Sequence, residues 1–162
     1  MANAGYDLRQ TAAAIGVFQA PADVAAEAPR PSRGRGPVHR ILLVEDNELN
    51  REIACCLLDD AGYAVDTAEN GEVAVGMIEE ADACAYDLVL MDIQMPVMDG
   101  YAATRAIRAL PDPLRASLPI IAVSANAFSE DRKRSLESGM DAHLPKPLDV
   151  HRLQSLIEKV VH

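Results

Sequence analysis

Three short apolar runs constrain the fold of this sequence most: ILLV at 41–44, LVLM at 88–91 and IIAV at 120–123. None of them alternates with polar residues, and this pattern is typical of strands that are buried on both faces of a parallel sheet. We therefore expect strands over residues 40–45, 87–92 and 119–124. Two weaker patterns predict further strands over residues 64–68 and 142–144.

Helical patterns fill the intervals between these strands. We expect helices over residues 47–61, 71–82, about 100–110 and about 128–138, and a last helix after residue 149. Asn70 and Asp149 are plausible N-caps, and Gly62 and Gly139 are plausible stop signals. Residues that recur at helical spacing are expected to form the apolar faces: Leu49, Ile53, Leu57 or Cys56, and Ala61; Val73, Met77, Ile78 and Ala81; Ala103, Ile107 and Leu110; Leu153, Leu156, Ile157 and Val160.

The alternation of strands and helices predicts an α/β fold. Strands that are separated by helices pair in parallel through right-handed crossovers, so that helices cover both faces of the sheet. The sequence therefore predicts a doubly wound (βα)5 domain over residues 39–162. Residues 1–38 contain an Ala- and Pro-rich stretch and are expected to form a flexible tail or linker.

Charge and cysteine content exclude several classes of protein. The chain has 162 residues and a net charge of −10; residues 1–39 hold four arginines and three acids, so residues 40–162 carry −11. This acidity argues against nucleic acid as a partner, because phosphate binding needs clustered cations. Three cysteines, two of them adjacent, form no disulfide framework and indicate a reducing, cytoplasmic compartment. We expect no membrane contact, since no run of about 18 apolar residues is present.

Polar residues lie at the ends of four predicted strands. Glu45 and Asp46 end or follow the first strand, Asp92 ends the third, Ser124 ends the fourth and Lys146 follows the fifth. The ligand site of an open parallel sheet lies beyond the carboxyl ends of its strands, so these side chains are expected to converge. Two carboxylates about 4 Å apart repel by about 4 kcal/mol at an effective dielectric constant near 20. A cation must offset this, and oxygen ligands without histidine or cysteine favour Mg²⁺ or Mn²⁺.

Asp92 is the central acid of this set and a candidate nucleophile that forms an acyl phosphate. A metal ion and Lys146 would neutralise charge on the transferred phosphoryl group, and the Ser124 hydroxyl would donate to one of its oxygens. A single acid at a strand end is also explained as a helix cap, but acids and a lysine at several strand ends are harder to explain in this way.

Four segments carry a family resemblance: LLVEDN at 42–47, LVLMDIQMPVMDG at 88–100, IIAVSA at 120–125 and LPKP at 144–147. On these motifs, residues 40–162 resemble the receiver domain of two-component response regulators and hybrid histidine kinases. The resemblance implies a flavodoxin-like fold with strand order 2-1-3-4-5. It also implies a domain that uses Mg²⁺ and catalyses its own phosphorylation and dephosphorylation.

The resemblance implies roles by position. Asp92 matches the phosphoacceptor, Asp46 the direct Mg²⁺ ligand and Glu45 an acid that acts through water. The other matches are Gln94 for a backbone carbonyl ligand, Ser124 for the switch hydroxyl, Lys146 for phosphate binding, Lys146–Pro147 for a cis peptide bond, and Gln94 and Asn126 for tuning autodephosphorylation. His143 stands where the family often has tyrosine or phenylalanine. It is interpreted as a partly exposed polar residue, as a switch residue or as a pH-sensitive contact.

The leading hypothesis is a phosphoacceptor switch that takes a phosphoryl group from the phosphohistidine of a histidine kinase or a histidine phosphotransfer domain. Residues 47–53 are expected to dock the donor. The face formed by residues 128–138, 142–144 and the last helix is expected to bind a partner or a second copy of the chain.

Two alternative functions stay open. One is a receiver-like interaction module that does not use phosphate. The other is a phosphatase of the haloacid dehalogenase type, which is disfavoured because that family has a second acid where Gln94 stands. The chain is either a stand-alone regulator or the receiver of a larger, membrane-associated hybrid kinase.

Overall fold

The computed structural model describes residues 40–126 and 128–161, so the predicted tail over residues 1–38 lies outside the described residues. The elements in chain order are β1 (Arg40–Val44), α3 (Glu48–Asp60), β2 (Ala64–Ala68), α4 (Gly71–Glu80), β3 (Leu88–Asp92), α5 (Gly100–Arg108), α6 (Pro113–Ala116), β4 (Ile120–Ser124), α7 (Ser129–Ser138), β5 (Ala142–Pro145) and α8 (Val150–Val160). Among these helices, none is long and apolar enough to span a bilayer.

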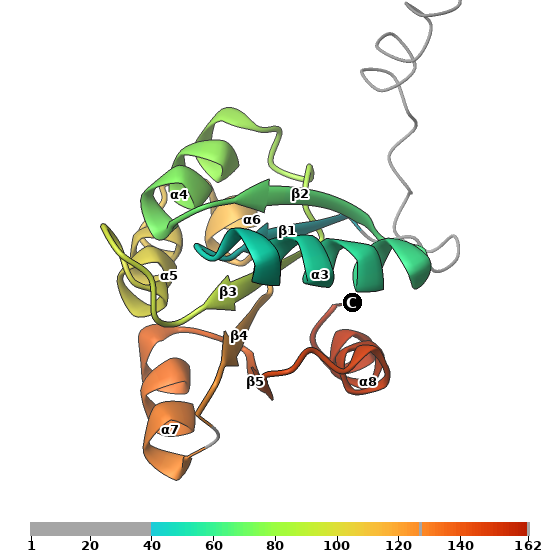
Figure 1. The fold of residues 1–162 in the computed structure, drawn as a ribbon. Coiled ribbons are helices and arrows are strands. Elements are labelled where there is room, and N and C mark those ends of the chain that lie inside the picture. The colour runs from blue at the N-terminus through green and yellow to red at the C-terminus, as the bar shows by residue number, and fades with distance from the viewer. Residues whose placement is uncertain (1–39, 127, 162) are drawn as a thin grey trace, which may run out of the picture. The chain divides into compact units, whose positions relative to one another are not determined.

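The strands form one parallel sheet in the order β2-β1-β3-β4-β5 (Figure 1). This confirms the expected fold class and strand order. Leu43 of β1 pairs with Leu90 of β3, and Asp92 at the end of β3 pairs with Val123 of β4. Because all the strands run in one direction, their carboxyl ends meet at a single edge of the sheet.

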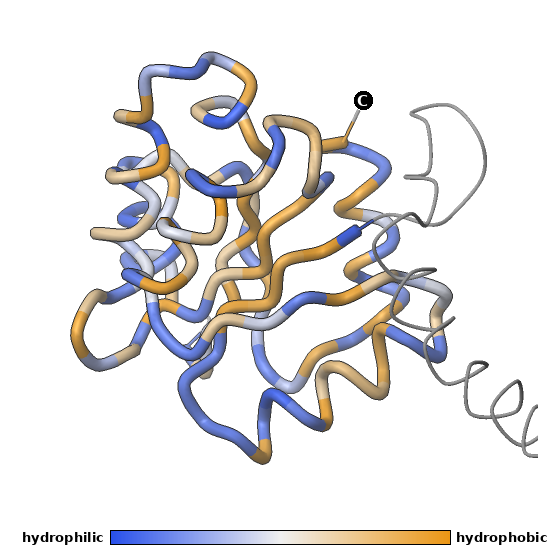
Figure 2. The backbone as a smooth tube through the Cα atoms, turned by 90° about the horizontal axis from the view of Figure 1, so that it is seen from above, coloured by the Kyte–Doolittle hydropathy of each residue, from blue (hydrophilic) through white to orange (hydrophobic). Residues whose placement is uncertain are grey.

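Two apolar layers enclose the sheet. In one layer, Ile41 and Leu43 of β1 pack with residues of α3 and α8, among them Leu58 and Leu153. In the other, strand residues such as Leu42 pack with the inner faces of α4 and α5. Figure 2 shows the hydrophobic colour running along the strands and polar colour around the periphery. Both faces of the central strands are thus buried, which is why their apolar runs do not alternate.

Helix boundaries agree with the predicted ones to within two residues. The predicted caps form: the Asn70 side chain accepts from the Val73 amide at 2.9 Å, and Asp149 accepts from the His151 amide at 2.9 Å. Gly139 ends α7 with φ 103°, a left-handed conformation that favours glycine. The sequence predicts Val73 on the apolar face of its helix, but this side chain is 39% exposed, because the helix turns Ala74 toward the sheet instead.

The short helix α6 was not predicted. Asp112 caps it by accepting a hydrogen bond from the Leu114 amide at 2.9 Å, and Pro113 occupies its first turn. Both residue types are common at helix starts. Four residues are too few to produce an apolar period, so the pattern carried no signal.

The predicted apolar face of α3 is wrong in its orientation. Leu49, Ile53 and Leu57 are 64, 52 and 37% exposed, whereas Leu58 is fully buried. The helix packs on the sheet through Leu58 and the smaller side chains of Ala54 and neighbouring positions. Helical spacing shows which residues share a face, but not which face meets the sheet. An apolar stripe therefore remains on the outside of α3.

Arg108 ties the second half of the fold together. Its guanidinium donates to the carbonyl oxygens of Ala116 and Leu118 at 2.8 Å each and of Gly139 at 2.9 Å, and it pairs with Asp141 at 3.0 Å. These contacts join α5 to the segments that precede β4 and β5. They help to fix the position of β4, which ends in Ser124, and of β5, which Lys146 follows.

Candidate functional site

Polar side chains from four strand ends line a cleft of about 170 Å³ at the carboxyl edge of the sheet. The structure brings together seven of the residues singled out from the sequence: Glu45, Asp46, Asp92, Gln94, Ser124, Asn126 and Lys146. His143 is not among the residues that line this cleft, but it contacts Ser124 from β5. The convergence follows from the parallel sheet, which places residues up to 101 positions apart side by side.

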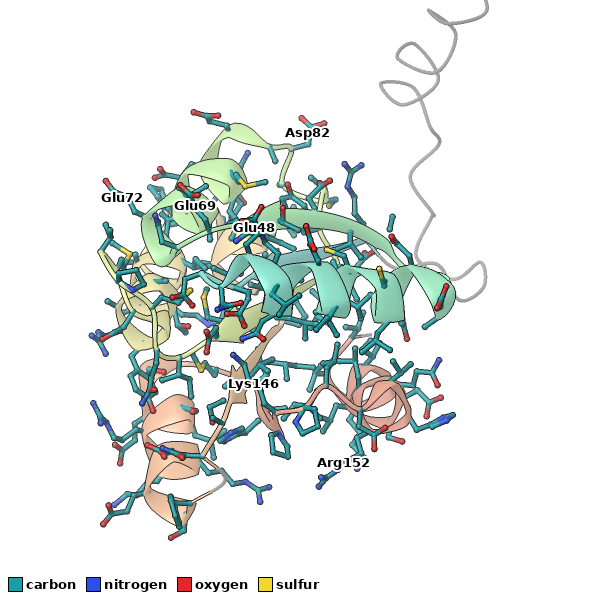
Figure 3. The ribbon with its side chains drawn as sticks, viewed as in Figure 1. Glu48, Glu69, Glu72, Asp82, Lys146 and Arg152 are labelled. Atoms are coloured by element: carbon teal, nitrogen blue, oxygen red, sulfur yellow. The ribbon has the colours of Figure 1, made fainter. Side chains whose placement is uncertain are left out.

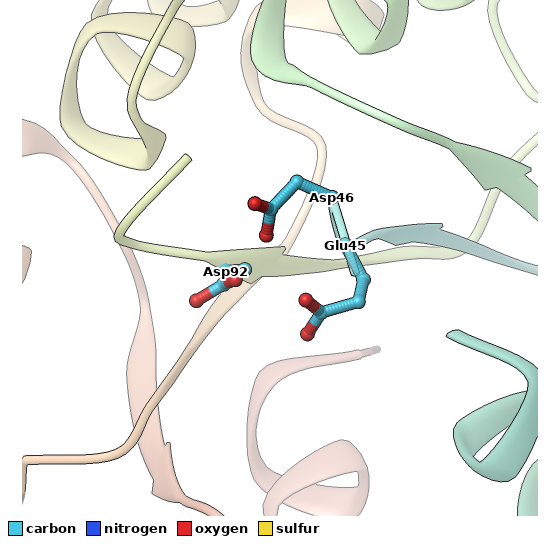
Figure 4. A group of neighbouring side chains, drawn as sticks. All are labelled: Glu45, Asp46 and Asp92. Carbon is cyan, nitrogen blue, oxygen red and sulfur yellow. The ribbon is translucent and has the colours of Figure 1, made fainter. Parts of the chain in front are cut away.

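Three carboxylates form the centre of the cleft (Figure 4). One oxygen from each of Glu45, Asp46 and Asp92 lies within 4.8 Å of the others. Glu45 and Asp92 are each only 5% exposed, whereas Asp46 is exposed. Negative charges at this separation repel strongly where little water reaches them.

Lys146 supplies the positive charge nearest to these acids in the described part of the chain. Its Nζ lies 2.7 Å from Glu45 Oε2 and 3.4 Å from Asp92 Oδ2. Figure 3 shows Lys146 among the strand ends, whereas Glu72 and Asp82 project from the outside of the α4 region. A single lysine charge stands against three carboxylates, so the cluster keeps an excess of negative charge.

This excess shifts the proton equilibria of the cleft. Burial, followed by the charge of Glu45, raises the pKa of Asp92 from 3.8 to about 6, although Lys146 opposes the shift. Burial lowers the pKa of Lys146, but its hydrogen bond to Glu45 and the charge of Asp92 outweigh burial, so this pKa is raised. Lys146 therefore stays protonated at neutral pH, while an ionised Asp92 is held at a free-energy cost.

Two residues without a predicted role shape the loops around the acids. Arg51 Nη1 donates to the Glu45 carbonyl oxygen at 2.8 Å, which fixes the turn between β1 and α3. A Cβ at Gly100 would overlap the Asp92 carbonyl oxygen, so only glycine fits beside that strand end. The Asp99-Gly100 pair after the apolar run was the sequence signal that could have identified Gly100. No sequence pattern could have identified Arg51, because its contact depends on the geometry of the turn.

Ser124 ends β4, the strand next to β3, and Lys146 directly follows β5, the next strand along the sheet. Ser124 is 6% exposed, and its Oγ lies 2.6 Å from the Asn126 carbonyl oxygen and 2.9 Å from His143 Nε2. The peptide bond between Lys146 and Pro147 is cis. Asn50 of α3 and Asp131 of α7 also line the cleft, and sequence reasoning missed both. Their approach is set by helix packing, which local patterns do not report.

The donor set fits a hard divalent cation. All three clustered ligand groups are carboxylates, and the cluster contains neither histidine nor cysteine. Mg²⁺ binds in proteins through one or two carboxylates, keeps several waters and accepts phosphate oxygens. The buried excess of negative charge is the feature of this structure that a Mg²⁺ ion would offset.

Comparisons with known proteins agree with this geometry. The family model described as "Response regulator receiver domain" matches residues 41–158. The chain is 47% identical over 122 residues to the two-component response regulator ORR41 of Oryza sativa, covering 74% of this chain and 92% of that protein. It is 40% identical over 152 residues to the sensor protein GacS of Pseudomonas syringae, covering 93% of this chain but 16% of that protein.

Solved structures give the same result. The receiver domain of sensor histidine kinase PA1611 from Pseudomonas aeruginosa, with a magnesium ion coordinated in its active site cleft, is 40% identical with a TM-score of 0.67, covering 76% of this chain and 98% of that one. The Saccharomyces cerevisiae Ssk1 receiver, crystallised with the histidine phosphotransfer protein Ypd1, is 29% identical with a TM-score of 0.68, covering 77% and 90%. The chain therefore belongs to the response regulator receiver domain family.

Proposed function

We propose that this chain is a phosphoacceptor switch of two-component signalling and that Asp92 is the residue phosphorylated. One observation carries the proposal: Asp92 lies buried in a polar cleft, 3.4 Å from Lys146 and beside two further carboxylates. An ion pair that served only stability would not need three acids around one lysine. The donor is a phosphohistidine of a histidine kinase or a histidine phosphotransfer domain.

The chemistry is a transfer of one phosphoryl group. A carboxylate oxygen of Asp92 forms a bond to phosphorus as the phosphorus–nitrogen bond of the donor breaks, and the electron pair of that bond returns to the donor imidazole. Lys146 holds a phosphoryl oxygen by a charge-assisted hydrogen bond. When bound, Mg²⁺ or Mn²⁺ neutralises charge on the phosphoryl oxygens; Asp46, Asp92, the Gln94 carbonyl and, through water, Glu45 would hold it.

Phosphorylation alters the cleft through charge and hydrogen bonding. Asp92 changes from about one negative charge to about two and gains acceptor oxygens. Lys146 is drawn from Glu45 toward the phosphate, and the Ser124 hydroxyl donates to it. Because these residues end β4 and follow β5, the loops after both strands move with them.

We propose that the exposed stripe of α3 docks the phosphohistidine donor. Leu49 and Ile53 are more than half exposed, and Ile53 and Leu57 line a groove of about 370 Å³ that reaches Pro147 and the acidic cleft. Exposed apolar residues that adjoin a polar site are typical of interaction surfaces. A receiver crystallised with a histidine phosphotransfer protein is among the relatives of this chain, which supports this assignment.

We propose a second partner surface on α7, β5 and α8. A groove of about 420 Å³ lies there, lined by Arg132, Arg152 and Lys159 together with His143. Figure 3 shows Arg152 on the side opposite the labelled acids. None of the three cations forms an ion pair with another described residue. A carboxylate-bearing partner, or a second copy of this acidic chain, suits such a surface.

A labelling experiment tests the proposed function. The full chain is incubated with radiolabelled acetyl phosphate, with and without Mg²⁺, and acid-stable but base-labile label is counted. The wild type is expected to be labelled only with Mg²⁺, Asp92→Asn is expected to remain unlabelled, and Glu79→Gln, an exposed change on α4, controls for lost charge. Undiminished labelling of Asp92→Asn would refute the assignment of Asp92. A wild-type chain that takes no label and binds no Mg²⁺ would instead favour the phosphate-independent interaction module.

We also propose a cytoplasmic location and a linker role for residues 1–38. The matched region forms 16% of GacS and 92% of ORR41, so both a hybrid kinase and a stand-alone regulator are compatible contexts.

A further inference from the structure

The Ser124 hydroxyl is engaged by two groups outside the acidic cluster. Its oxygen lies 2.6 Å from the Asn126 carbonyl oxygen and 2.9 Å from His143 Nε2. Among the described residues, neither the Asp92 nor the Lys146 side chain is a hydrogen-bond partner of the Ser124 hydroxyl, although all three residues line the same cleft. The hydroxyl is therefore hydrogen-bonded to these two groups and not to the carboxylate to which the phosphoryl group would be attached.

Counting protons fixes the direction of both hydrogen bonds. A hydroxyl carries one proton, and a backbone carbonyl carries none. In the 2.6 Å contact, the Ser124 hydroxyl therefore donates its proton to the Asn126 carbonyl oxygen. Toward His143 the hydroxyl can only accept, so a proton must sit on Nε2. In a neutral imidazole this leaves Nδ1 without a proton.

The surroundings of His143 keep its ring neutral. His143 lies on β5 beside Ala122 of β4 and is half-buried. Burial lowers the pKa of His143, the charge of Arg132 lowers it further, and Asp131 opposes them. Both charged residues belong to α7. At neutral pH the ring is thus the Nε2–H tautomer, which the hydrogen bond to Ser124 requires.

We propose that His143 is a positioning residue: its Nε2–H holds the Ser124 hydroxyl in the orientation that precedes phosphorylation. The inference rests on the proposed function of Asp92. For Ser124 to donate its single proton to a phosphoryl oxygen, the hydroxyl must leave the Asn126 carbonyl. Rotation toward Asp92 also takes the serine oxygen away from His143 and leaves a half-buried N–H without its acceptor. The hydrogen bond therefore favours the unphosphorylated state.

The hydrogen bond between Ser124 and His143 also connects the acidic cleft to the surface groove on α7, β5 and α8. His143 lines the groove between α7, β5 and α8, next to Arg132 and Arg152. When Ser124 leaves, the imidazole N–H is free to turn to another acceptor on that side. The position of one hydroxyl is thereby coupled to the groove through a single histidine side chain, without a tyrosine or phenylalanine at this position.

Binding of beryllofluoride, which mimics a phosphoryl group on a carboxylate, tests the inference. Affinity is measured by calorimetry with Mg²⁺ for the wild type, His143→Phe and His143→Gln. Phenylalanine keeps a ring but loses the N–H, and it is expected to tighten binding about fivefold, the factor that corresponds to one net hydrogen bond. Glutamine places an N–H near the Nε2 position and is expected to bind like the wild type. In a Ser124→Ala background, His143→Phe is expected to have no effect.

The tautomer is measured separately, by ¹⁵N chemical shifts of the His143 ring in the free protein. A protonated Nε2 and an unprotonated Nδ1 are expected; the opposite tautomer would overturn the inference. Equal affinities for the three proteins, or equal tightening by phenylalanine and glutamine, would overturn it as well. A wild type that binds no beryllofluoride at all defeats the proposed function instead. If His143→Phe does not fold, the glutamine variant and the tautomer still decide the question.

Discussion

Neutralising Asp92 is predicted to stabilise the metal-free protein, although the change damages the proposed active site. The pKa of Asp92 rises from 3.8 in an unfolded chain to about 6 in the folded one. The folded protein therefore binds this proton more tightly than the unfolded chain does. Well below pH 3.8 the carboxyl is protonated in both states, and no stability is lost. As the pH rises from below 3.8 to above 6, folding becomes less favourable by about 3 kcal/mol.

Asparagine resembles the protonated carboxyl and carries no charge at any pH. The attraction of Asp92 to Lys146 is already included in the raised pKa, so the loss of that ion pair is part of the balance. Asp92→Asn is thus expected to raise the free energy of unfolding by about 3 kcal/mol at pH 7.5 and by about half as much at pH 5.0. The gain must shrink as the pH falls, because the wild-type carboxyl takes up its proton.

Urea unfolding of both proteins in the presence of EDTA, followed by circular dichroism at the two pH values, measures this difference. Glu52→Gln, on the exposed side of α3, controls for the change in net charge and is expected to change stability little at either pH. An Asp92→Asn variant that is no more stable than the wild type at pH 7.5 would refute the reasoning. A gain that is equal at both pH values would point to packing rather than to charge.

Three further perturbations test other parts of the structure. Millimolar Mg²⁺ is expected to raise the thermal midpoint of the wild type and to act much less on Asp92→Asn in a parallel melt, since the proposed ion site consists of carboxylates that folding brings together. Arg108→Met removes three hydrogen bonds to carbonyl oxygens and is expected to lower the free energy of unfolding by about 3 kcal/mol in urea titrations. Ile53→Glu places a charge on the α3 stripe and is expected to slow phosphotransfer from a phosphohistidine protein at least tenfold, while labelling by acetyl phosphate stays unchanged. Slowing of both reactions by Ile53→Glu would contradict donor docking on α3.

The sheet was the most predictable part of this molecule. A strand buried on both faces leaves an unbroken apolar run, so β1, β3 and β4 could be read directly from ILLV, LVLM and IIAV. Parallel connection then placed Asp92, Ser124 and Lys146 at one edge without any knowledge of side-chain contacts. The convergence of the site follows from chain direction and strand ends alone.

What could not be predicted depends on how the helices turn and where long-range contacts form. The spacing of Leu49, Ile53 and Leu57 identified a face of α3, yet that face points outward because Leu58 meets the sheet. The hydrogen bond between Ser124 and His143 joins residues 19 positions apart through the register of β4 and β5. A pattern within one element carries no information about such a contact.

The same cluster explains both the instability of the cleft and its capacity to respond. Lys146 is shared by Glu45 at 2.7 Å and Asp92 at 3.4 Å, so its charge is divided before any phosphate arrives. A phosphoryl group on Asp92 would add negative charge where one lysine already fails to offset three acids. Attraction to that group would draw Lys146 away from Glu45. The Lys146–Glu45 contact is weakened more easily because the same lysine charge is already shared with Asp92. A cleft with a balanced ion pair would need to break a satisfied interaction to respond, whereas this cleft begins with a deficit of positive charge that a bound cation and a movement of Lys146 would relieve.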